Sequence, residues 1–292
     1  MLKYAFFLGC NIPARVSQYE ASSRAVLKKA GVELVDIREF GCCGYPLLNI
    51  DYRAFMFSAA TNLALAEEAN LDILVMCKCG YGSLKKAEHV MKKDGELRKE
   101  VIRLLAEKGL KYEGKTEVKH LLSVLYHDVG IDRLKNKISG SYKGLRIATH
   151  YGCHALRPSD ITGFDDPVAP TLFDELVEIT GAESIDWTSK LECCGAPLTG
   201  INDDLSIDLT KKKLRDGKKA GAHYLCTACP FCHLQFDTVQ KMMASHNGNE
   251  EYLASILYPQ LLGLCMGIDK ETLGIHMNQL DISGVASFLT QE

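Results

Sequence analysis

Short apolar runs alternate along the chain with longer segments of helical periodicity. Four runs of strand length end on a cysteine or just before one, at residues 4–8, 71–76, 145–149 and 222–225. Segments with apolar residues at helical spacing lie between them, as at 53–68 and 205–219. Strands that alternate with helices predict parallel α/β units. In open α/β sheets, sites form beyond the carboxyl ends of the strands, so the cysteines are expected there.

The cysteines follow a pattern that occurs twice. The string CCGYPL at 42–47 returns 151 residues later as CCGAPL at 193–198, and an isoleucine, Ile50 or Ile201, follows each string. A cysteine after a glycine precedes each string, and a close cysteine pair follows each. This order indicates an internal duplication. The cysteines of the two copies are Cys10, Cys42, Cys43, Cys77 and Cys79, then Cys153, Cys193, Cys194, Cys229 and Cys232.

The duplication predicts the domain organisation. We expect two Rossmann-like parallel-sheet α/β domains related by pseudo-twofold symmetry, residues 1–142 and 143–292, with metal sites at the carboxyl ends of their strands. The stretch 108–142, polar around an apolar helix at 121–129, is expected to join them. Residues 160–170 are expected to form a loop, and a helical extension is expected at the C-terminus.

Composition and compartment narrow the chemistry. The chain has 292 residues, 47% of them hydrophobic, a net charge of −3 and twelve cysteines. The charge gives no indication of a nucleic-acid partner. The apolar stretch before Cys10 is too short for a signal peptide, and that at 252–268 is too interrupted for a membrane span. We therefore expect a cytoplasmic protein, in which clustered cysteines bind metal or carry out redox chemistry.

Five thiols in each half exceed the four donors of a tetrahedral zinc site. Adjacent cysteines of an extended segment point in opposite directions, so each pair either bridges two irons of a larger cluster or contains one spectator. The glycine after each pair permits a backbone conformation or close approach that a side chain would block. The chain has no Gly-rich nucleotide fingerprint, so electrons must arrive through another protein. Cys226 and Cys265, outside the pattern, are predicted core residues. The lysines at 211–213 are predicted to lie on a solvated helix face or, alternatively, a docking surface.

The duplicated pattern resembles the CCG, or cysteine-rich, domain family. The strings YGCH at 151–154, CPFCHLQFD at 229–237 and QLLGL at 260–264 are similar to the B subunit of heterodisulfide reductase, over essentially the whole chain. The resemblance implies a noncubane [4Fe-4S] cluster, held by five cysteines, in each half, with a disulfide substrate between the two. Carried over, the second cluster would use Cys153, Cys193, Cys194, Cys229 and Cys232. The first would use Cys10, Cys42, Cys43, Cys77 and Cys79. His154 and His233, with His150, are candidates to assist as donors to cluster sulfur or substrate.

The first copy departs from the family at its last cysteine pair. The family has CxxC followed by an aromatic residue, glycine and serine, whereas this chain reads CKCGYGS at 77–83. Gly80 therefore stands where the second family cysteine belongs, and the thiol moves to Cys79. The N-terminal site is left open between a normal cluster, a different cluster, zinc and no metal.

The resemblance implies an iron–sulfur catalytic subunit of a heterodisulfide reductase-like complex. It would reduce or form a disulfide such as coenzyme M–coenzyme B, or act on a related sulfur compound, in methanogenesis or sulfur metabolism. Its implied partners are an iron–sulfur (HdrC-like) subunit, a flavoprotein (HdrA-like) subunit and a small-molecule thiol or disulfide. The alternative is an electron-transfer or structural subunit with one working cluster and no disulfide substrate of its own.

Overall fold

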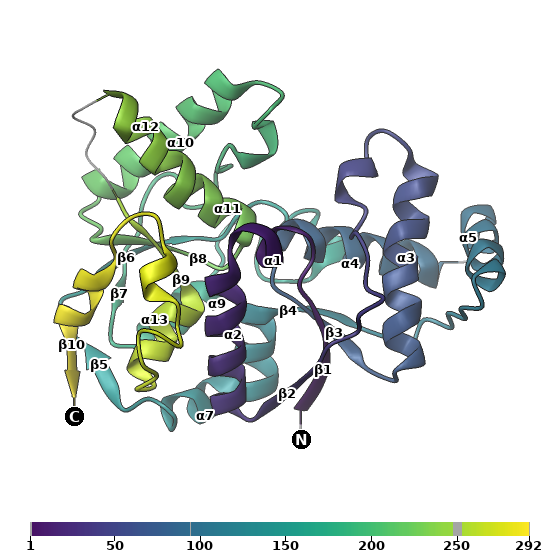
Figure 1. The fold of residues 1–292 in the computed structure, drawn as a ribbon, viewed down its shortest axis with the longest axis horizontal. Coiled ribbons are helices and arrows are strands. Elements are labelled where there is room, and N and C mark those ends of the chain that lie inside the picture. Colours follow the sequence, from purple (N-terminus) through teal and green to yellow (C-terminus); the bar gives the residue numbers. More distant parts are fainter. Residues whose placement is uncertain (1, 94, 248–252, 292) are drawn as a thin grey trace.

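The computed structural model describes residues 2–93, 95–247 and 253–291, and its core is two parallel four-stranded sheets (Figure 1). The first sheet has the order β2-β1-β3-β4, with bounds Val32–Val35, Leu2–Phe7, Asp72–Val75 and Val118–His120. The second has the order β7-β6-β8-β9, with bounds Glu183–Ser184, Arg146–His150, Tyr224–Thr227 and Ser255–Leu257. The two orders are equivalent strand for strand, so the predicted duplicated α/β fold with parallel sheets is confirmed.

Helices follow the strands in matching order in both halves. The first half contains α1 (Asn11–Arg15), α2 (Ser17–Ala30), α3 (Tyr52–Glu68), α4 (Lys78–Lys92), α5 (Glu96–Glu107), α6 (Leu121–Ser123) and α7 (Ile131–Lys135). The second contains α8 (Ser159–Thr162), α9 (Leu172–Glu178), α10 (Asp203–Lys219), α11 (Pro230–Leu234), α12 (Gln240–Asn247) and α13 (Tyr258–Cys265). Two π-helical segments, η2 (Val124–Gly130) and η4 (Gln235–Val239), continue α6 and α11.

The long helices α3 and α10 begin in the same way. The Asp51 carboxylate caps α3 by accepting from the backbone N–H groups of Arg53 and Ala54, and Asn202 accepts from Leu205 at the start of α10. Such side chains satisfy N–H groups that have no partner within a helix. The isoleucines before these caps, Ile50 and Ile201, are both 82% exposed. The repeat in the sequence is therefore a repeat of local structure.

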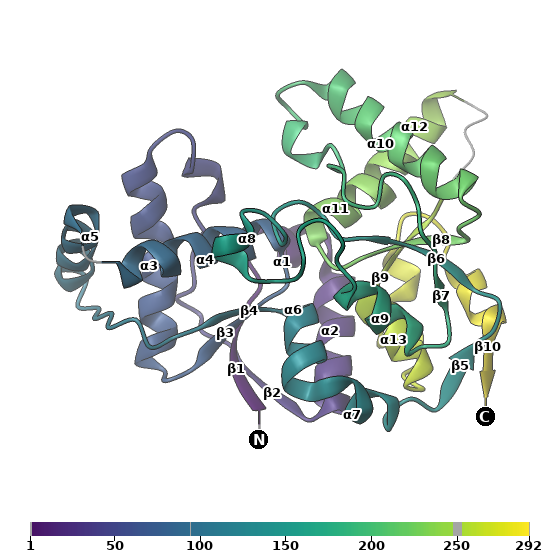
Figure 2. The ribbon, with the colours of Figure 1, turned by 180° about the vertical axis from the view of Figure 1, so that it is seen from behind.

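Helices of each half pack against helices of the other half. Helix α2 of the first half packs on α13 of the second, and α9 of the second packs on α6 of the first (Figures 1 and 2). The Tyr142 hydroxyl of the first half donates to the Leu261 carbonyl of the second at 3.0 Å. One hydrophobic core consequently runs through both halves. This reciprocal arrangement is what pseudo-twofold symmetry predicts.

Three segments that the sequence singled out take the following structures, and the helix expected at 121–129 is present as α6 and η2. The stretch 108–142 contributes β4 to the first sheet, and also β5 (Gly140–Tyr142), which pairs antiparallel with β10 (Leu289–Gln291). The loop expected at 160–170 begins inside the short helix α8. The apolar stretch 252–268 forms β9 and α13 over its described residues. Among the described residues, no helix is long and apolar enough to cross a membrane.

Candidate metal centre

Both CCG segments form the same turn, and the turn requires glycine. Gly44 has φ of 81° and Gly195 has φ of 90°, in the left-handed region that favours glycine. A Cβ on Gly44 would lie 2.8 Å from the carbonyl oxygen of Phe55, and one on Gly195 would lie 2.4 Å from that of Ser206. These two oxygens belong to the first turns of α3 and α10. The predicted need for both conformation and close approach is confirmed.

The turn brings adjacent cysteine side chains together. The Gly44 N–H donates to Cys42 Sγ at 3.3 Å, and the Gly195 N–H donates to Cys193 Sγ at 3.4 Å. The thiols of Cys42 and Cys43 interact, as do those of Cys193 and Cys194. The expectation that each pair points in opposite directions was wrong, because the chain turns here instead of running extended. Each pair can therefore face one metal centre.

Hydrogen bonds favour the thiolate form of the first cysteine in each pair. The neighbouring Cys43 thiol lowers the pKa of Cys42 to about 6. The thiols of Cys153 and Cys194 lower the pKa of Cys193 to about 2. The thiolate is the form that binds metal. The arrangement thus suits metal binding at both turns.

The five second-half cysteines meet at the carboxyl ends of β6 and β8. Cys153 interacts with Cys193, Cys194 with Cys232, and Cys232 with Cys229. A small cavity opens among them, lined by Lys78, Cys79, His150, Gly152, Cys153, His154, Cys194, Pro197, Cys229, Phe231 and Cys232. The structure therefore brings together all five cysteines predicted for the second site.

One cysteine of the CxC pair of the first half, Cys79, also lines this cavity. Cys77 precedes α4 and interacts with both Cys229 and Cys79. Cys79, buried, lies with its Sγ 3.5 Å from Nδ1 of His154, and the same nitrogen is 3.4 Å from Cys153 Sγ. These contacts close a ring, which we call the thiol ring. Its members are Cys153, Cys193, Cys194, Cys232, Cys229, Cys77, Cys79 and His154.

The three remaining patterned cysteines lie together in the first half. Cys42 interacts with Cys43, and the electrostatic influence of Cys10 also reaches Cys43. Cys10 and Cys42 are exposed, whereas Cys43 is partly buried. Among the described interactions, seven of the ten patterned cysteines belong to the thiol ring, and the other three lie together in the first half.

The histidines at the site have different surroundings. His154 bridges two thiols; burial opposes its charged form, but the contact with Cys79 outweighs burial and raises the pKa of His154. His150 places Nε2 3.3 Å from Cys232 Sγ. His233 instead contacts Gln18, Ser255 and Asp237, and burial lowers its pKa to about 3. His154 and His150 therefore contact cysteine thiols, while His233 is a neutral histidine of the interior.

Two buried lysines, Lys78 and Lys213, lie near the thiols of the ring. Lys78 donates to the His150 carbonyl at 3.1 Å, and Lys213 donates to the carbonyls of Ser189 and Glu192. Lys213 is fully buried, so the expectation of a solvated face was wrong at this position. Burial lowers the pKa of Lys213 to about 8. Sequence reasoning missed both lysines as site residues, and only the place of Lys78 between two cysteines was a signal.

The donors of the thiol ring fit an iron–sulfur cluster. Cysteine thiolates are the usual ligands of such clusters. Burial lowers the pKa of Lys78 and of Lys213, and the neighbouring ring thiols oppose that shift, so an anionic centre among the thiols would favour the ammonium form of both lysines. The first-half trio fits less well, because three thiols fall short of the four donors of tetrahedral zinc or a Cys₄ cluster.

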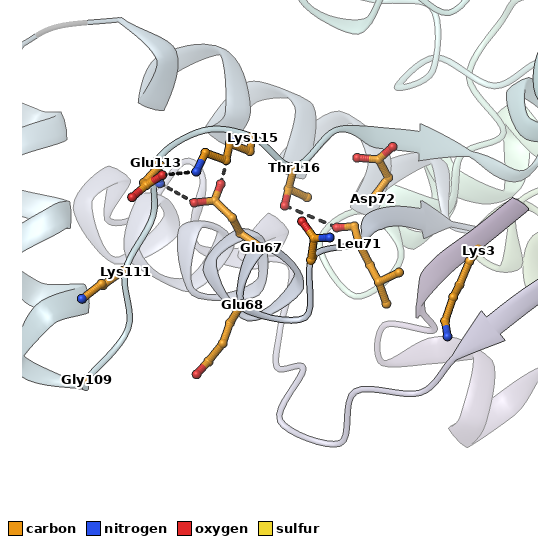
Figure 3. A pocket seen from close by; sticks show the side chains of 11 residues that line it. Lys3, Glu67, Glu68, Leu71, Asp72, Gly109, Lys111, Glu113, Lys115 and Thr116 are labelled. Carbon is orange, nitrogen blue, oxygen red and sulfur yellow. Dashed lines mark hydrogen bonds and ion pairs between the residues drawn. The ribbon is translucent and has the colours of Figure 1, made fainter.

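Figure 3 shows a larger hollow whose lining contains no cysteine. It opens at the amino ends of β1 and β3, beside the loop 109–116. The carboxylate of Glu67, which lines the hollow, accepts hydrogen bonds from the backbone N–H groups of Glu113, Gly114 and Lys115. The carboxylate thus holds a surface loop in place. Strand polarity puts the site at the opposite edge, so this hollow is not the functional site.

Comparison with known families agrees with this geometry. The model of the cysteine-rich (CCG) domain matches residues 4–85 and again 147–237. The chain belongs to the CCG family. The two matched segments contain all ten patterned cysteines, five in each. The predicted family with two CCG copies is confirmed.

Relatives of this CCG protein span nearly its whole length. It is 36% identical to the B subunit of the ferredoxin/F(420)H(2)-dependent CoB-CoM heterodisulfide reductase of Methanosarcina acetivorans, covering 96% of this chain and 94% of that protein. It is 36% identical to a protein of Archaeoglobus profundus that is named as similar to the heterodisulfide reductase B subunit, covering 93% of each. It is also 31% identical to the "8-methylmenaquinol:fumarate reductase membrane anchor subunit" of Wolinella succinogenes, covering 96% of this chain and 97% of that one. The predicted similarity to the B subunit of heterodisulfide reductase is therefore confirmed.

The fold also has a solved counterpart. A hypothetical protein from Helicobacter pylori superposes with a TM-score of 0.75 at 18% identity, over 96% of this chain. The CCG protein spans about half, 52%, of that chain. At this identity the likeness concerns the fold alone.

Proposed function

We propose that this protein is an iron–sulfur subunit of a heterodisulfide reductase-like oxidoreductase complex, and that it reduces or forms a disulfide bond. The observation that carries the proposal is the thiol ring at the carboxyl ends of β6 and β8. In this proposal Cys153, Cys193, Cys194, Cys229 and Cys232 are the ligands of one cluster of the noncubane [4Fe-4S] type. The names of the Methanosarcina and Archaeoglobus relatives support this assignment.

The side chains of the site would have different roles in binding the cluster and moving protons. When bound, the cluster would supply the electron-transfer chemistry of the reaction. The cysteines hold it, and the turn at Gly195 directs Cys193 and Cys194 toward it. His154, in contact with two thiols, stands where a proton is needed when a disulfide becomes two thiols. Burial of Cys194, Cys229 and Cys232 keeps water away from the metal.

The proposal includes partners, because the Methanosarcina relative is named as one subunit of a reductase. Electrons would come from an iron–sulfur (HdrC-like) and a flavoprotein (HdrA-like) subunit. The proposed substrate is a small disulfide such as coenzyme M–coenzyme B or a related sulfur compound, in methanogenesis or sulfur metabolism. We propose residues 1–142 and 143–292 as the two domains and the cytoplasm as the compartment.

The test measures metal and activity on protein purified without oxygen. Iron, zinc and acid-labile sulfide are counted per chain, and oxidation of a reduced viologen dye is followed with the coenzyme M–coenzyme B disulfide. About four or eight irons with matching sulfide, together with disulfide-dependent dye oxidation, are expected. A chain without iron and sulfide would refute the proposal.

A second candidate is an electron-transfer subunit with one cluster and no disulfide substrate. Two observations favour it: only three cysteines gather in the first half, and one relative is named as part of a fumarate reductase. Four irons per chain and no dye oxidation with any disulfide tested would support this candidate over the first.

A further inference from the structure

The start of helix α4 lies against the other half of the molecule. The Tyr81 hydroxyl donates to the Thr162 carbonyl at 2.6 Å. A Cβ on Gly82 would lie 2.8 Å from the carbonyl oxygen of His154, so no larger residue fits between helix and loop. The segment Cys77-Lys78-Cys79, at the head of this helix, is therefore held against the second half by several independent contacts.

The cysteines of this segment contact second-half groups. Cys77 packs against a hydrophobic cluster whose other members all belong to the second half. Cys79 is 7% exposed and lines the cavity of the thiol ring. Its Sγ contacts Nδ1 of His154, the same nitrogen that Cys153 Sγ contacts. The first-half trio Cys10, Cys42 and Cys43 makes no such contact with Cys79 among the described interactions.

The lysine of the segment, Lys78, also contacts groups of the second half. Lys78 is 2% exposed; its ammonium donates to the His150 carbonyl and lies 5.3 Å from the centre of the Phe173 ring. Its stem occupies the space that a side chain at residue 152 would need, since a Cβ on Gly152 would be 3.0 Å from Lys78 Cδ. Burial disfavours the charged form of Lys78 and the electrostatic influence of Cys232 and Cys229 favours it, so anionic sulfur beside this lysine would stabilise its ammonium.

Gly80 occupies the position where the family has a cysteine, and the space around it would admit a side chain. Gly80 stands in α4 where Cys232 stands in α11, three residues after the cysteine that precedes each helix. A Cβ on Gly80 would meet no atom closer than 3.4 Å, the distance to Val75 Cγ1. Packing therefore does not require glycine here, and the thiol has moved from a first-half position to one that faces the second half.

We propose that the segment Cys77-Lys78-Cys79 serves the second-half metal centre across the interface, with Cys79 as a sixth thiol of that centre and Lys78 as its buried counter-charge. This inference rests on the proposed iron–sulfur function. It leaves the first half with three cysteines, and so without a complete ligand set for a second cluster.

The test separates the two halves by substitution in the whole protein. Cys79→Ser is compared with the parent in two backgrounds: Cys42→Ser with Cys43→Ser, and Cys193→Ser with Cys194→Ser. In the first background we expect Cys79→Ser to change the EPR and visible spectra of the remaining cluster. In the second, we expect it to leave bound metal and spectra unchanged. The reverse pattern would assign Cys79 to the first half and overturn the inference.

The lysine provides a readout that does not depend on removing a thiol. Lys78→Met removes a positive charge beside the cluster, and we expect its midpoint potential to shift to a more negative value, because the reduced cluster loses electrostatic stabilisation. Lys78→Arg keeps the charge and is expected to restore most of the parent potential. An unchanged potential in Lys78→Met would overturn the inference. Absence of iron and sulfide in the parent would instead refute the proposed function on which it rests.

Discussion

The turn at Gly195 decides where two ring cysteines lie, and an alanine there tests the reason for glycine. Gly195→Ala places a methyl group 2.4 Å from the Ser206 carbonyl oxygen while φ is 90°. The left-handed conformation costs an alanine roughly 1–2 kcal/mol. Relieving the overlap by shifting backbone costs a further 1–3 kcal/mol or so. We therefore expect the free energy of unfolding to fall by about 2–5 kcal/mol.

Gly200 is the matched control for this substitution. It lies in the loop after the same turn with φ of 80°, and no atom lies within 4 Å of where its Cβ would be. Gly200→Ala should cost only the conformational part, about 1–2 kcal/mol. Urea unfolding of both variants under anaerobic conditions measures the difference, and bound iron should fall only in Gly195→Ala. Equal losses of stability in the two variants would refute the close approach as the reason for glycine.

Three other predictions address ligands, acid stability and the surface hollow. Cys193→Ala should abolish the cluster's visible and EPR signal, whereas Cys265→Ala, in the core, should leave bound iron unchanged; a normal spectrum in the first variant would contradict the ligand assignment. Burial lowers the pKa of His120 from 6.5 to about 3, so the unfolded chain binds more protons between these pH values, and stability falls on acidification by up to about 1.4 kcal/mol per pH unit. His120→Asn keeps an acceptor for the N–H of Leu122 and should flatten that slope in unfolding titrations; equal slopes would disprove it. Glu67→Ala should cost about 1–3 kcal/mol of stability without loss of iron, and lost iron would show that this hollow affects the metal site.

Much of the fold could be predicted from the amino-acid sequence. The repeated CCG string and its spacing predicted the duplication, and apolar runs ending at cysteines predicted the strands that carry the site. Cys226 and Cys265, outside the pattern, were correctly predicted as core residues and are fully buried. Strand β4 was missed because Val118–His120 is three residues long and contains a lysine, so its pattern is too short to distinguish from a loop.

Other features depended on tertiary contacts. Lys213 belongs by sequence to a basic run, but its helix packs so that the ammonium reaches the carbonyls of Ser189 and Glu192. The paired cysteines were expected to diverge, and the positive φ of Gly44 and Gly195 turns them toward each other. The lysine's partners lie 21 and 24 residues away along the chain, so local spacing does not encode them, whereas the cysteine turn is local and follows from the conformation of its glycine.

The sequence by itself determined the family, the two copies and the ten cysteines at strand ends, since periodicity and motif spacing are local properties of the chain. Only the tertiary structure decided how the cysteines are divided. Helix α2 packs on α13 and α9 packs on α6 across the two halves, and the contact of Cys79 with His154 places the start of α4 beside the loop of His154. Cys77 and Cys79 thereby join the second-half thiols, because the packing of one half against the other, rather than distance along the chain, decides which sulfur atoms meet.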